Sequence, residues 1–426
     1  RYDFTFWSSP VTLASNFTLH DLSPDTLADK YYIYNPSSGW VIDYGGTSTK
    51  MVPGEGYNVR APQTFDINST AIYQASFVGV PTNGNVTVNP VGGKWNIVGN
   101  PYPSAIDGVK FIQNTDVGAV YFWTHANKPV YNPGSNTYKY ATTDYTTFNL
   151  TGTAGPDFPG SVTPTGNIGA GQGFFVKSPS GNPIVFTNDM RVAGNNSNFY
   201  KTAQTAELER NRLWLNFTNT EGAFKQALVG YIEGASDSWD VNYDAVTLNG
   251  NNFIDFYSIN EAKKLTIQGR ALPFEESDIV PLGYRTTITG EFTIAIDHVD
   301  GIFKDQNVYL EDKLTGKIQD LKAGNYTFST VIGTFSDRFT IRYTNKTLGN
   351  DDFETIEGGL LVSVKNKVIG VTSAKENIKE VNIYDISGRL LYSKNKVDSA
   401  ELSISNLQSS NQVLLVKVTL ENDAQV

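Results

Sequence analysis

The sequence predicts an all-β protein in which tandem β-sandwich domains precede a smaller C-terminal sandwich. Short segments rich in Val, Ile, Thr, Tyr, Phe and Trp recur along the chain, and these residue types favour strands. The 38 Gly and 18 Pro residues separate the segments in a pattern typical of tight turns. Long helices are scarce in this pattern, so the strands are expected to close into sandwiches or barrels.

An aromatic-rich β-sandwich is expected over residues 1–200. Two strand-like segments, residues 30–34 and 40–44, flank the turn sequence of residues 35–39, and this arrangement predicts a β-hairpin. Residues 173–177 are a further strand of the same kind. Short strands joined by frequent turns are typical of a sandwich.

A second β-sandwich is expected over residues 201–345. The polar stretch 201–211 separates it from the first, and residues 212–217 then alternate with period two. A closing strand is predicted over residues 338–343. We therefore place a domain boundary near residue 200.

A short linker and a small third domain complete the predicted organisation. Residues 346–359 are polar, acidic and flanked by Gly, which is typical of a linker. The third domain covers residues 360–426. In its last predicted strand, 413–420, every second residue is apolar, as in a half-buried antiparallel strand. These apolar residues are Leu414, Val416, Val418 and Leu420.

Composition narrows the classes of function. A formal net charge of −10, with no long Lys/Arg run, disfavours binding to nucleic acid or anionic lipid. The 426 residues include no Cys, which excludes disulfides and thiol-based catalytic or metal sites. No run of about 18 apolar residues occurs, so no membrane-spanning helix is expected. Residues 1–7 are typical of a strand rather than a signal peptide, and we expect a secretory signal to lie upstream.

One segment of the third domain carries a specific family signature. Residues 381–392 contain an Asp-x-Ser-Gly turn, beginning at Asp385, between two predicted strands. Gly388 is suited to a positive φ, and Asp385 can accept hydrogen bonds from its own turn backbone. Together with residues 402–407 and 413–418, this segment resembles the type A C-terminal sorting domain of type IX secretion cargo.

The resemblance implies an Ig-like sandwich that carries its cargo through the outer-membrane translocon of Bacteroidota. It also implies capture by an outer-membrane β-barrel shuttle protein and delivery to the cell surface. The basic ending of the family is absent before Val426, so the sorting domain is expected to continue past that residue. The residues expected to contact these partners are Tyr384, Asp385, Gly388, Arg389 and Lys417.

The upstream part of the chain carries a second resemblance. Residues 1–343 are similar to the stalk regions of large flavobacterial surface proteins and adhesins, through segments that include 99–105, 170–176 and 228–234. Both resemblances together imply an exported, adhesin-type cell-surface protein without enzymatic activity. The alternative is a carbohydrate-binding module or accessory domain of a secreted polysaccharide-degrading enzyme.

Candidate catalytic residues are sparse. The three His residues lie far apart in sequence and no nucleophile motif accompanies them, so no catalytic triad is predicted. Residues 169–173 precede a strand instead of opening a helix, which favours a tight turn over a phosphate-binding loop. Glu275, Glu276 and Asp278 beside Arg270 are the best candidates for glycosidase chemistry, although a solvated turn is the favoured interpretation.

Two further predictions concern ligands. Asp237, Asp240 and Asp244 lie in one acidic loop and could offer oxygen ligands to calcium, although a solvated loop is the favoured interpretation. Trp40 and Tyr102 lie beside turns, where exposed aromatic rings can stack on sugars. These rings make a surface glycan a further candidate partner, and Trp40 is the ring expected to be exposed.

Overall fold

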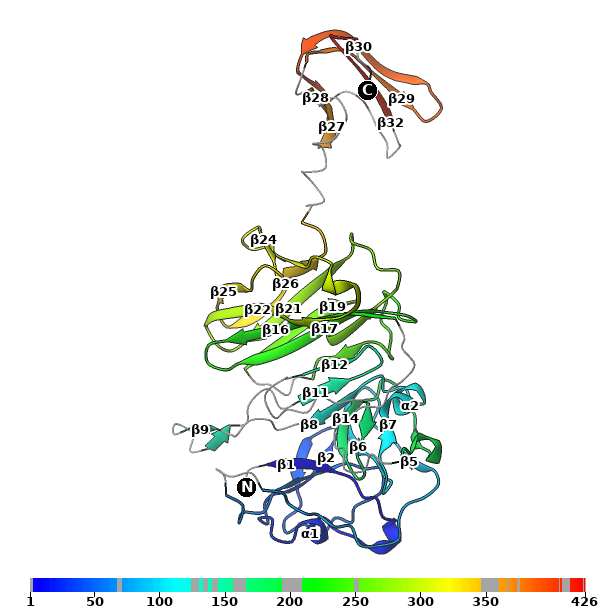
Figure 1. The fold of residues 1–426 in the computed structure, drawn as a ribbon, viewed down its shortest axis with the longest axis vertical. Helices are drawn as coiled ribbons and strands as arrows, with labels where there is room; N and C mark the ends of the chain where they lie inside the picture. The colour runs from blue at the N-terminus through cyan, green and yellow to red at the C-terminus, as the bar shows by residue number, and fades with distance from the viewer. Residues whose placement is uncertain are drawn as a thin grey trace. The chain divides into compact units, whose positions relative to one another are not determined.

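The chain folds into two compact units, Arg1–Thr344 and Asn345–Val426 (Figure 1). The computed structural model describes residues 3–66, 71–123, 130–132, 137–139, 145–155, 166–193, 209–248, 253–345, 360–365, 368–373, 376–405, 407, 414–423 and 425. Regular structure in these residues is almost entirely β-strand, which confirms the predicted all-β class. None of the helices in this part of the chain has the length and apolar character needed to span a bilayer. The predicted linker, residues 346–359, lies outside the described residues.

The first sheet of the N-terminal unit is antiparallel, with the strand order β1-β4-β2-β3. Strands β2 and β3 form the predicted hairpin, and Asn35 Oδ1 accepts hydrogen bonds from the backbone N–H groups of Ser37 and Ser38 at 2.8 and 3.2 Å. Gly39 follows this turn with a φ of +84°, which glycine adopts without strain. The strands are β1 (Phe4–Trp7), β2 (Tyr31–Asn35), β3 (Gly39–Ile42) and β4 (Tyr57–Arg60).

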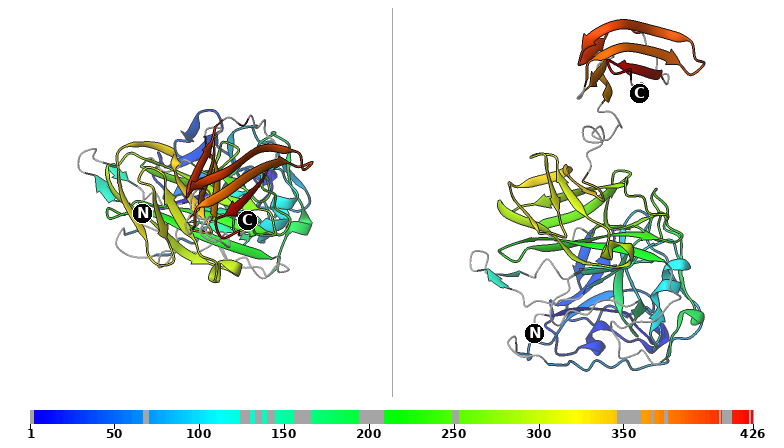
Figure 2. Two further views of the ribbon diagram at one scale, coloured as in Figure 1. Left: turned by 90° about the horizontal axis from the view of Figure 1, so that it is seen from above. Right: turned by 45° about the horizontal axis from the view of Figure 1, so that its top comes forward.

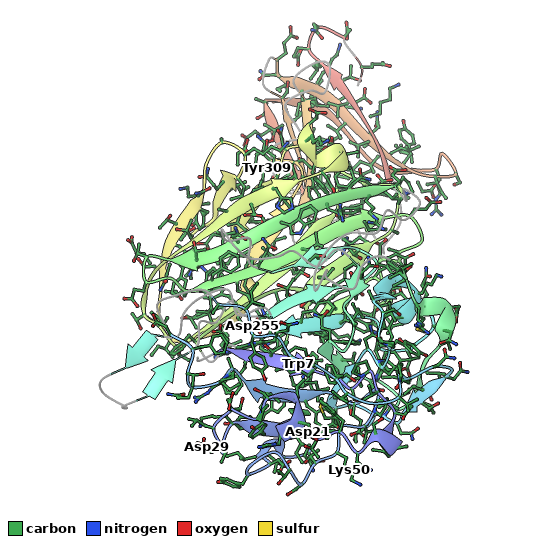
Figure 3. The ribbon with its side chains drawn as sticks, turned by 60° about the horizontal axis from the view of Figure 1, so that its bottom comes forward. Trp7, Asp21, Asp29, Lys50, Asp255 and Tyr309 are labelled. Carbon is green, nitrogen blue, oxygen red and sulfur yellow. The ribbon has the colours of Figure 1, made fainter. Side chains whose placement is uncertain are left out.

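Two short helices, η1 (Leu13–Ser15) and α1 (Leu19–Leu22), join β1 to β2. Helix α1 begins with a capping box, in which the Thr18 hydroxyl accepts the Asp21 N–H at 3.2 Å and Asp21 Oδ2 accepts the Thr18 N–H at 2.9 Å. Asp21 is labelled in Figure 3. The Thr18 hydroxyl also donates to Asp21 Oδ2 at 2.7 Å, and this hydrogen bond, followed by the one from the Thr18 N–H, lowers the pKa of Asp21 below its ordinary value. The cap therefore fixes the helix that buries Leu19 and Leu22.

The second sheet has five strands in the order β12-β11-β8-β14-β6. Its strands are β6 (Trp95–Gly99), β8 (Val120–Trp123), β11 (Tyr145–Phe148), β12 (Thr153–Ala154) and β14 (Gly173–Lys177). Adjoining elements are the pairs β5 (Val86–Val88) with β15 (Ile184–Phe186), β7 (Ile106–Asp107) with β13 (Asn167–Ile168) and β9 (Val130–Asn132) with β10 (Thr137–Lys139), and the helices α2 (Gly108–Gln113) and η2 (Asn188–Met190). Both faces of the sheet are buried, because Phe174 enters a core with Phe111 whereas its neighbour Phe175 enters a core with Leu228.

The largest sheet contains strands β16 to β26 and curls around a core of its own. Its strands follow the order β24-β23-β26-β21-β19-β20-β17-β16-β22-β25, with β18 paired to β20. Leu213, Leu215 and Phe217 of β16 all enter this core, which confirms their predicted period of two. The elements are β16 (Arg210–Asn219), β17 (Phe224–Ile232), β18 (Ala245–Val246), β19 (Ile254–Asn260), β20 (Lys263–Arg270), β21 (Ile279–Thr286), β22 (Gly290–Val299), η3 (Gly301–Lys304), β23 (Tyr309–Asp312), β24 (Lys317–Asp320), β25 (Tyr326–Thr330) and β26 (Gly333–Arg342).

The two regions that we expected as separate sandwich domains pack together in one compact unit (Figure 2). Strand β17 is buried on both faces, because Leu228 contacts the five-stranded sheet while Val229 points into the core of the largest sheet. The residues around the predicted boundary, 194–208, lie outside the described part of the chain. The shared core includes Tyr121, Phe175, Trp214, Leu228 and Ile267.

The C-terminal unit is a sandwich of two three-stranded sheets, with the orders β27-β28-β31 and β30-β29-β32. Both sheets contribute to one apolar core, so the unit is stabilised by burial of its own side chains. Val418 and Leu420 are buried, and Leu414 and Val416 pack against the same core, which confirms the predicted alternation. The strands are β27 (Leu360–Lys365), β28 (Val368–Ser373), β29 (Ile378–Asp385), β30 (Leu390–Ser399), β31 (Glu401–Ile404) and β32 (Leu414–Leu420).

Candidate functional site

One buried carboxylate organises the turn between β29 and β30. Asp385 Oδ1 accepts hydrogen bonds from the N–H groups of Ser387 and Arg389 at 3.0 and 3.1 Å, and Asp385 Oδ2 accepts one from Arg389 Nε at 3.0 Å. The hydrogen bond from the Ser387 hydroxyl is the main cause that lowers the pKa of Asp385. Gly388 has a φ of +81°. The predicted roles of Asp385 and Gly388 within the turn are therefore confirmed.

An exposed apolar row crosses the outer face of the sheet β30-β29-β32. Leu390 of β30 and Leu415 of β32 both lie opposite Tyr384 of β29 in the strand register. Residues directly opposite each other on neighbouring strands project from the same face. Leu390 is 51% and Leu415 56% exposed, and Tyr384 is half-buried between them. We call Leu390, Tyr384 and Leu415 the apolar row.

Further side chains extend this face. Ile386, in the turn beside the apolar row, is 78% exposed. Lys417 is exposed and follows Leu415 by two positions on β32, so both side chains leave the strand on the same side. Arg389 is also exposed, although its Nε bonds to Asp385. The face thus combines apolar groups with positive charge.

The predicted contact residues divide into two groups. Tyr384, Arg389 and Lys417 lie on or beside the exposed face. Asp385 is buried and is occupied by hydrogen bonds from its own turn, so it does not present a surface for a partner. Gly388 contributes backbone conformation and has no side chain. Burial argues against direct partner contact by the Asp385 side chain, whereas contact through the exposed backbone of Gly388 stays a prediction.

Sequence reasoning predicted Tyr384 but missed the two leucines of the apolar row. Leu415 was detectable, since it occupies the side of the last predicted strand that Lys417 also occupies, opposite the core-facing residues. Leu390 gave no such signal. A bulge shifts the register between β29 and β30 at Ile383 and Tyr384, and this irregularity decides which β30 residue lies opposite Tyr384.

The two predicted sugar-stacking residues lie in different environments. Trp40 on β3 is 36% exposed, which confirms its predicted exposure, and its ring centroid lies 5.1 Å from that of Tyr34. Tyr102 is fully buried, its hydroxyl donates to the Gly84 carbonyl at 2.7 Å, and the Arg191 guanidinium lies 5.3 Å from its ring centroid. Tyr102 has no free face for a sugar, so that prediction is wrong.

Asp237, Asp240 and Asp244 do not form the predicted calcium site. The described residues contain no group of three or more His, Cys, Asp or Glu side chains arranged to hold a metal ion. Each carboxylate instead caps backbone N–H groups. Asp244 accepts those of Asp240 and Gly269 at 2.9 Å each, and Asp237 Oδ1 accepts that of Ala271 at 3.2 Å. The carboxylates point toward different parts of the backbone and not toward a common ion.

The candidate glycosidase carboxylates are also separated by their contacts. Asp278 accepts two hydrogen bonds from Arg270, at 2.6 and 2.7 Å, and one from the Tyr231 hydroxyl at 2.5 Å. Glu275 and Glu276 are exposed on the preceding turn. Asp278 therefore neutralises a buried guanidinium, while its two neighbours are solvated.

The remaining motifs have structural contacts. Gln172 Oε1 accepts the Gly169 N–H at 2.8 Å, which closes the predicted tight turn ahead of β14. The His298 ring stacks on Trp214 with centroids 3.9 Å apart, and His298 Nδ1 lies 2.6 Å from Asp297 Oδ2. His125 lies outside the described residues.

Two protein-family models match the chain. One, described as Domain of unknown function (DUF8693), matches residues 1–343, and the other, described as Domain of unknown function (DUF8694), matches residues 348–426. These ranges follow the division of the chain into its two compact units. No curated protein shows significant sequence similarity to the chain.

Proposed function

The chain belongs to the family described as Domain of unknown function (DUF8693), and we propose that it is a non-catalytic, adhesin-type segment of an exported cell-surface protein. In this proposal the C-terminal unit is recognised by the type IX secretion translocon and the outer-membrane β-barrel shuttle protein. The observation that carries it is the apolar row on the exposed face of a separate sandwich. The resemblance of residues 381–392 to a type A sorting domain supports the same assignment.

The chemistry of the exposed face suits a protein partner. Large apolar side chains gathered on one face mark interaction sites, because water contact with them is unfavourable. Arg389 and Lys417 beside the row favour a partner whose apolar surface has an acidic rim. Within the described residues, β30 and β32 are the two edge strands of their sheet, and Thr419 of β32 is bridged to Gln425. An edge strand can pair with a strand of a partner, and β30 is the edge that we propose for such pairing.

An export assay tests this proposal. The full chain, placed behind a secretory signal and extended by the native residues expected after Val426, is produced in a flavobacterium with an intact type IX system. The parent is expected at the cell surface, where added protease digests it, whereas the double variant Leu390→Ser/Leu415→Ser is expected to accumulate in the periplasm. The control Leu314→Ser/Val331→Ser removes two exposed apolar side chains from the N-terminal unit instead and is expected to be exported normally.

Two outcomes would contradict the proposal. Surface delivery of Leu390→Ser/Leu415→Ser at the parental level would show that the apolar row is not the recognised face. Surface delivery of the parent in a strain that lacks the translocon would exclude the type IX route.

Glycan binding by the N-terminal unit is a second candidate function, favoured by the exposure of Trp40. Tyr32 and Tyr34 lie beside Trp40, with ring centroids 6.4 and 5.1 Å away, so a sugar at Trp40 would meet an aromatic surface. Trp40→Ala is expected to weaken binding of the full chain to surface polysaccharide by about two- to tenfold. Retention of parental affinity in this variant, measured by affinity electrophoresis, would contradict a stacking role.

A further inference from the structure

A pocket of about 190 Å³ opens in the N-terminal unit between strands β8 and β14 and the segment 239–246. Apart from Asp244, its buried lining is mainly apolar and includes Val117, Ala119 and Tyr121. The Tyr121 hydroxyl donates to the Val246 carbonyl at 2.7 Å, so the ring rather than the hydroxyl is available to a ligand. The interior of the pocket therefore favours an apolar group.

Lys177, Trp239 and Lys263 line this pocket and are partly exposed, and we call these three residues the rim. Lys263 Nζ lies 5.0 Å from the Trp239 ring centroid and forms an ion pair with Glu261 Oε2 at 3.8 Å. Lys177 Nζ lies 5.8 Å from the Trp95 ring centroid, and Lys177 makes no ion pair with any residue that the structure describes. Lys177 therefore carries the unpaired positive charge of the rim, while Glu261 partly offsets that of Lys263.

Asp244 lines the same pocket but adds little negative charge to it. Its two carboxylate oxygens accept backbone N–H groups, and the residue is 1% exposed. Burial raises the pKa of Asp244 to about 7, so this carboxyl group is partly protonated near neutral pH. Thr247, the residue after the lining residue Val246, donates its hydroxyl at 2.7 Å to Asp255, which is labelled in Figure 3.

A tight turn positions the rim side chains. Glu261 and Ala262, between β19 and β20, have φ values of +46° and +62°, which residues other than glycine rarely adopt. Glu261 Oε1 accepts the Trp239 N–H at 3.2 Å and also faces Lys263. The strained turn thus holds Trp239 and Lys263 together before any ligand arrives.

We propose that this pocket binds a small carboxylate that carries a single apolar ring, such as an aromatic carboxylic acid. The ring occupies the apolar interior, and the carboxylate group remains at the rim between Lys177 and Lys263. This inference does not depend on the export proposal, because it concerns a different unit of the chain.

Size and polarity both support this class of ligand. An apolar cavity of roughly 150 Å³ holds one benzene ring, so a pocket of about 190 Å³ admits one ring with a small substituent. A sugar fits less well, because Val117 and Ala119 offer no hydrogen bonds to its hydroxyl groups. The two ammonium groups select an anionic substituent over a neutral one.

Ligand-observed ¹⁹F NMR with the intact chain tests the proposal. The probe 4-fluorobenzoate is expected to bind with a dissociation constant of about 1 mM or tighter. Its neutral counterpart 4-fluorobenzamide is expected to bind about tenfold more weakly, because it lacks the charge that the two lysines attract.

Variants separate the contributions of charge and cavity. Lys177→Gln and Lys263→Gln are each expected to weaken 4-fluorobenzoate binding about threefold and to leave 4-fluorobenzamide binding unchanged. The matched control is Lys264→Gln, at the next position of β20, where Nζ lies 4.8 Å from the Tyr257 ring centroid and outside the pocket lining. Val241→Phe fills the pocket and is expected to abolish binding of both probes, with circular dichroism used to verify folding.

Three results would overturn the inference. Equal affinity for the two probes, or an affinity for 4-fluorobenzoate that neither lysine substitution changes, would exclude an anion site at this rim. Binding that survives in folded Val241→Phe would place the probe elsewhere. Absence of binding to the parent at probe concentrations up to about 20 mM would exclude the pocket as a site for this class of ligand.

Discussion

Replacing Asp244 with Asn is expected to make the stability of the N-terminal unit less sensitive to rising pH. Burial raises the pKa of Asp244 from 3.8 to about 7. The unfolded chain therefore releases this proton near pH 4, whereas the folded unit keeps it up to about pH 7. The stability that the protonated carboxyl contributes is present in full below about pH 4 and is lost as the pH rises through about 7.

The size of the effect follows from the two pKa values. Each pKa unit corresponds to about 1.4 kcal/mol, so the interval from 3.8 to about 7 amounts to about 4 kcal/mol of stability. About 2 to 3 kcal/mol of this is lost between about pH 5 and pH 8. The Asn variant escapes that loss, because it has no titrating proton. Its amide nitrogen cannot accept one of the two backbone N–H groups, which costs about 1–3 kcal/mol at every pH.

Urea unfolding followed by tryptophan fluorescence measures this effect in the intact chain, because every tryptophan lies in the N-terminal unit. The free energy of unfolding of Asp244→Asn, relative to the parent, is expected to increase by about 2 to 3 kcal/mol from about pH 5 to pH 8. Asp237→Asn, at an exposed carboxylate of the same loop, controls for the change in net charge. The reasoning would be refuted if the difference in free energy of unfolding between Asp244→Asn and the parent stayed constant over this pH range. Asp244 would then already be ionised in the folded unit.

Arg338→Met is expected to lower the free energy of unfolding of the N-terminal unit by about 3–5 kcal/mol, because it removes the cation from a buried ion pair. Asp312 accepts hydrogen bonds from Arg338 Nε and Nη2 at 3.0 and 2.8 Å. A decrease of less than about 1 kcal/mol in the free energy of unfolding, measured with urea, would contradict this account. Ala262→Gly is expected to raise the stability of the same unit by up to about 1 kcal/mol, because glycine adopts a φ of +62° without the strain that alanine carries there. A lower midpoint of urea unfolding would count against this prediction. Gly388→Ala is expected to destabilise the C-terminal unit by about 1–2 kcal/mol, because its φ of +81° strains alanine while no atom lies within 4 Å of the added methyl group. Amide hydrogen exchange in β29 and β30 measures this last effect, and unchanged exchange would exclude strain at the turn.

Features that depend on near neighbours in sequence were predictable. The hairpin of β2 and β3 follows from the Asn35 side chain and the conformation of Gly39. The Asp385 turn likewise depends on hydrogen bonds within five consecutive residues. The alternation of β32 was readable because one face of that strand is buried and the other is not. Such an alternation of buried and exposed side chains does not describe β17, because two different sheets bury its two faces.

Features that depend on distant partners were not predictable. Tyr102 has the sequence context of an exposed turn, yet Gly84 and Arg191 enclose it. The acidic loop has the composition of a calcium site. In the folded unit, however, the Asp244 carboxylate points inward and accepts the backbone N–H of Gly269, which lies far along the chain. Periodicity and composition carry no information about such pairs.

By itself, the sequence determined the all-β class, the positions of the strands named above, and the Asp385 turn, because backbone preferences and hydrogen bonds between near neighbours decide these features. Only the tertiary structure decided that the two expected sandwich domains pack together through a shared cluster of buried side chains. It also decided which aromatic and acidic side chains remain exposed, and it brought Lys177, Trp239 and Lys263 to one pocket. These outcomes depend on packing between segments far apart in the chain, where a strand register or a single bulge determines which side chains meet.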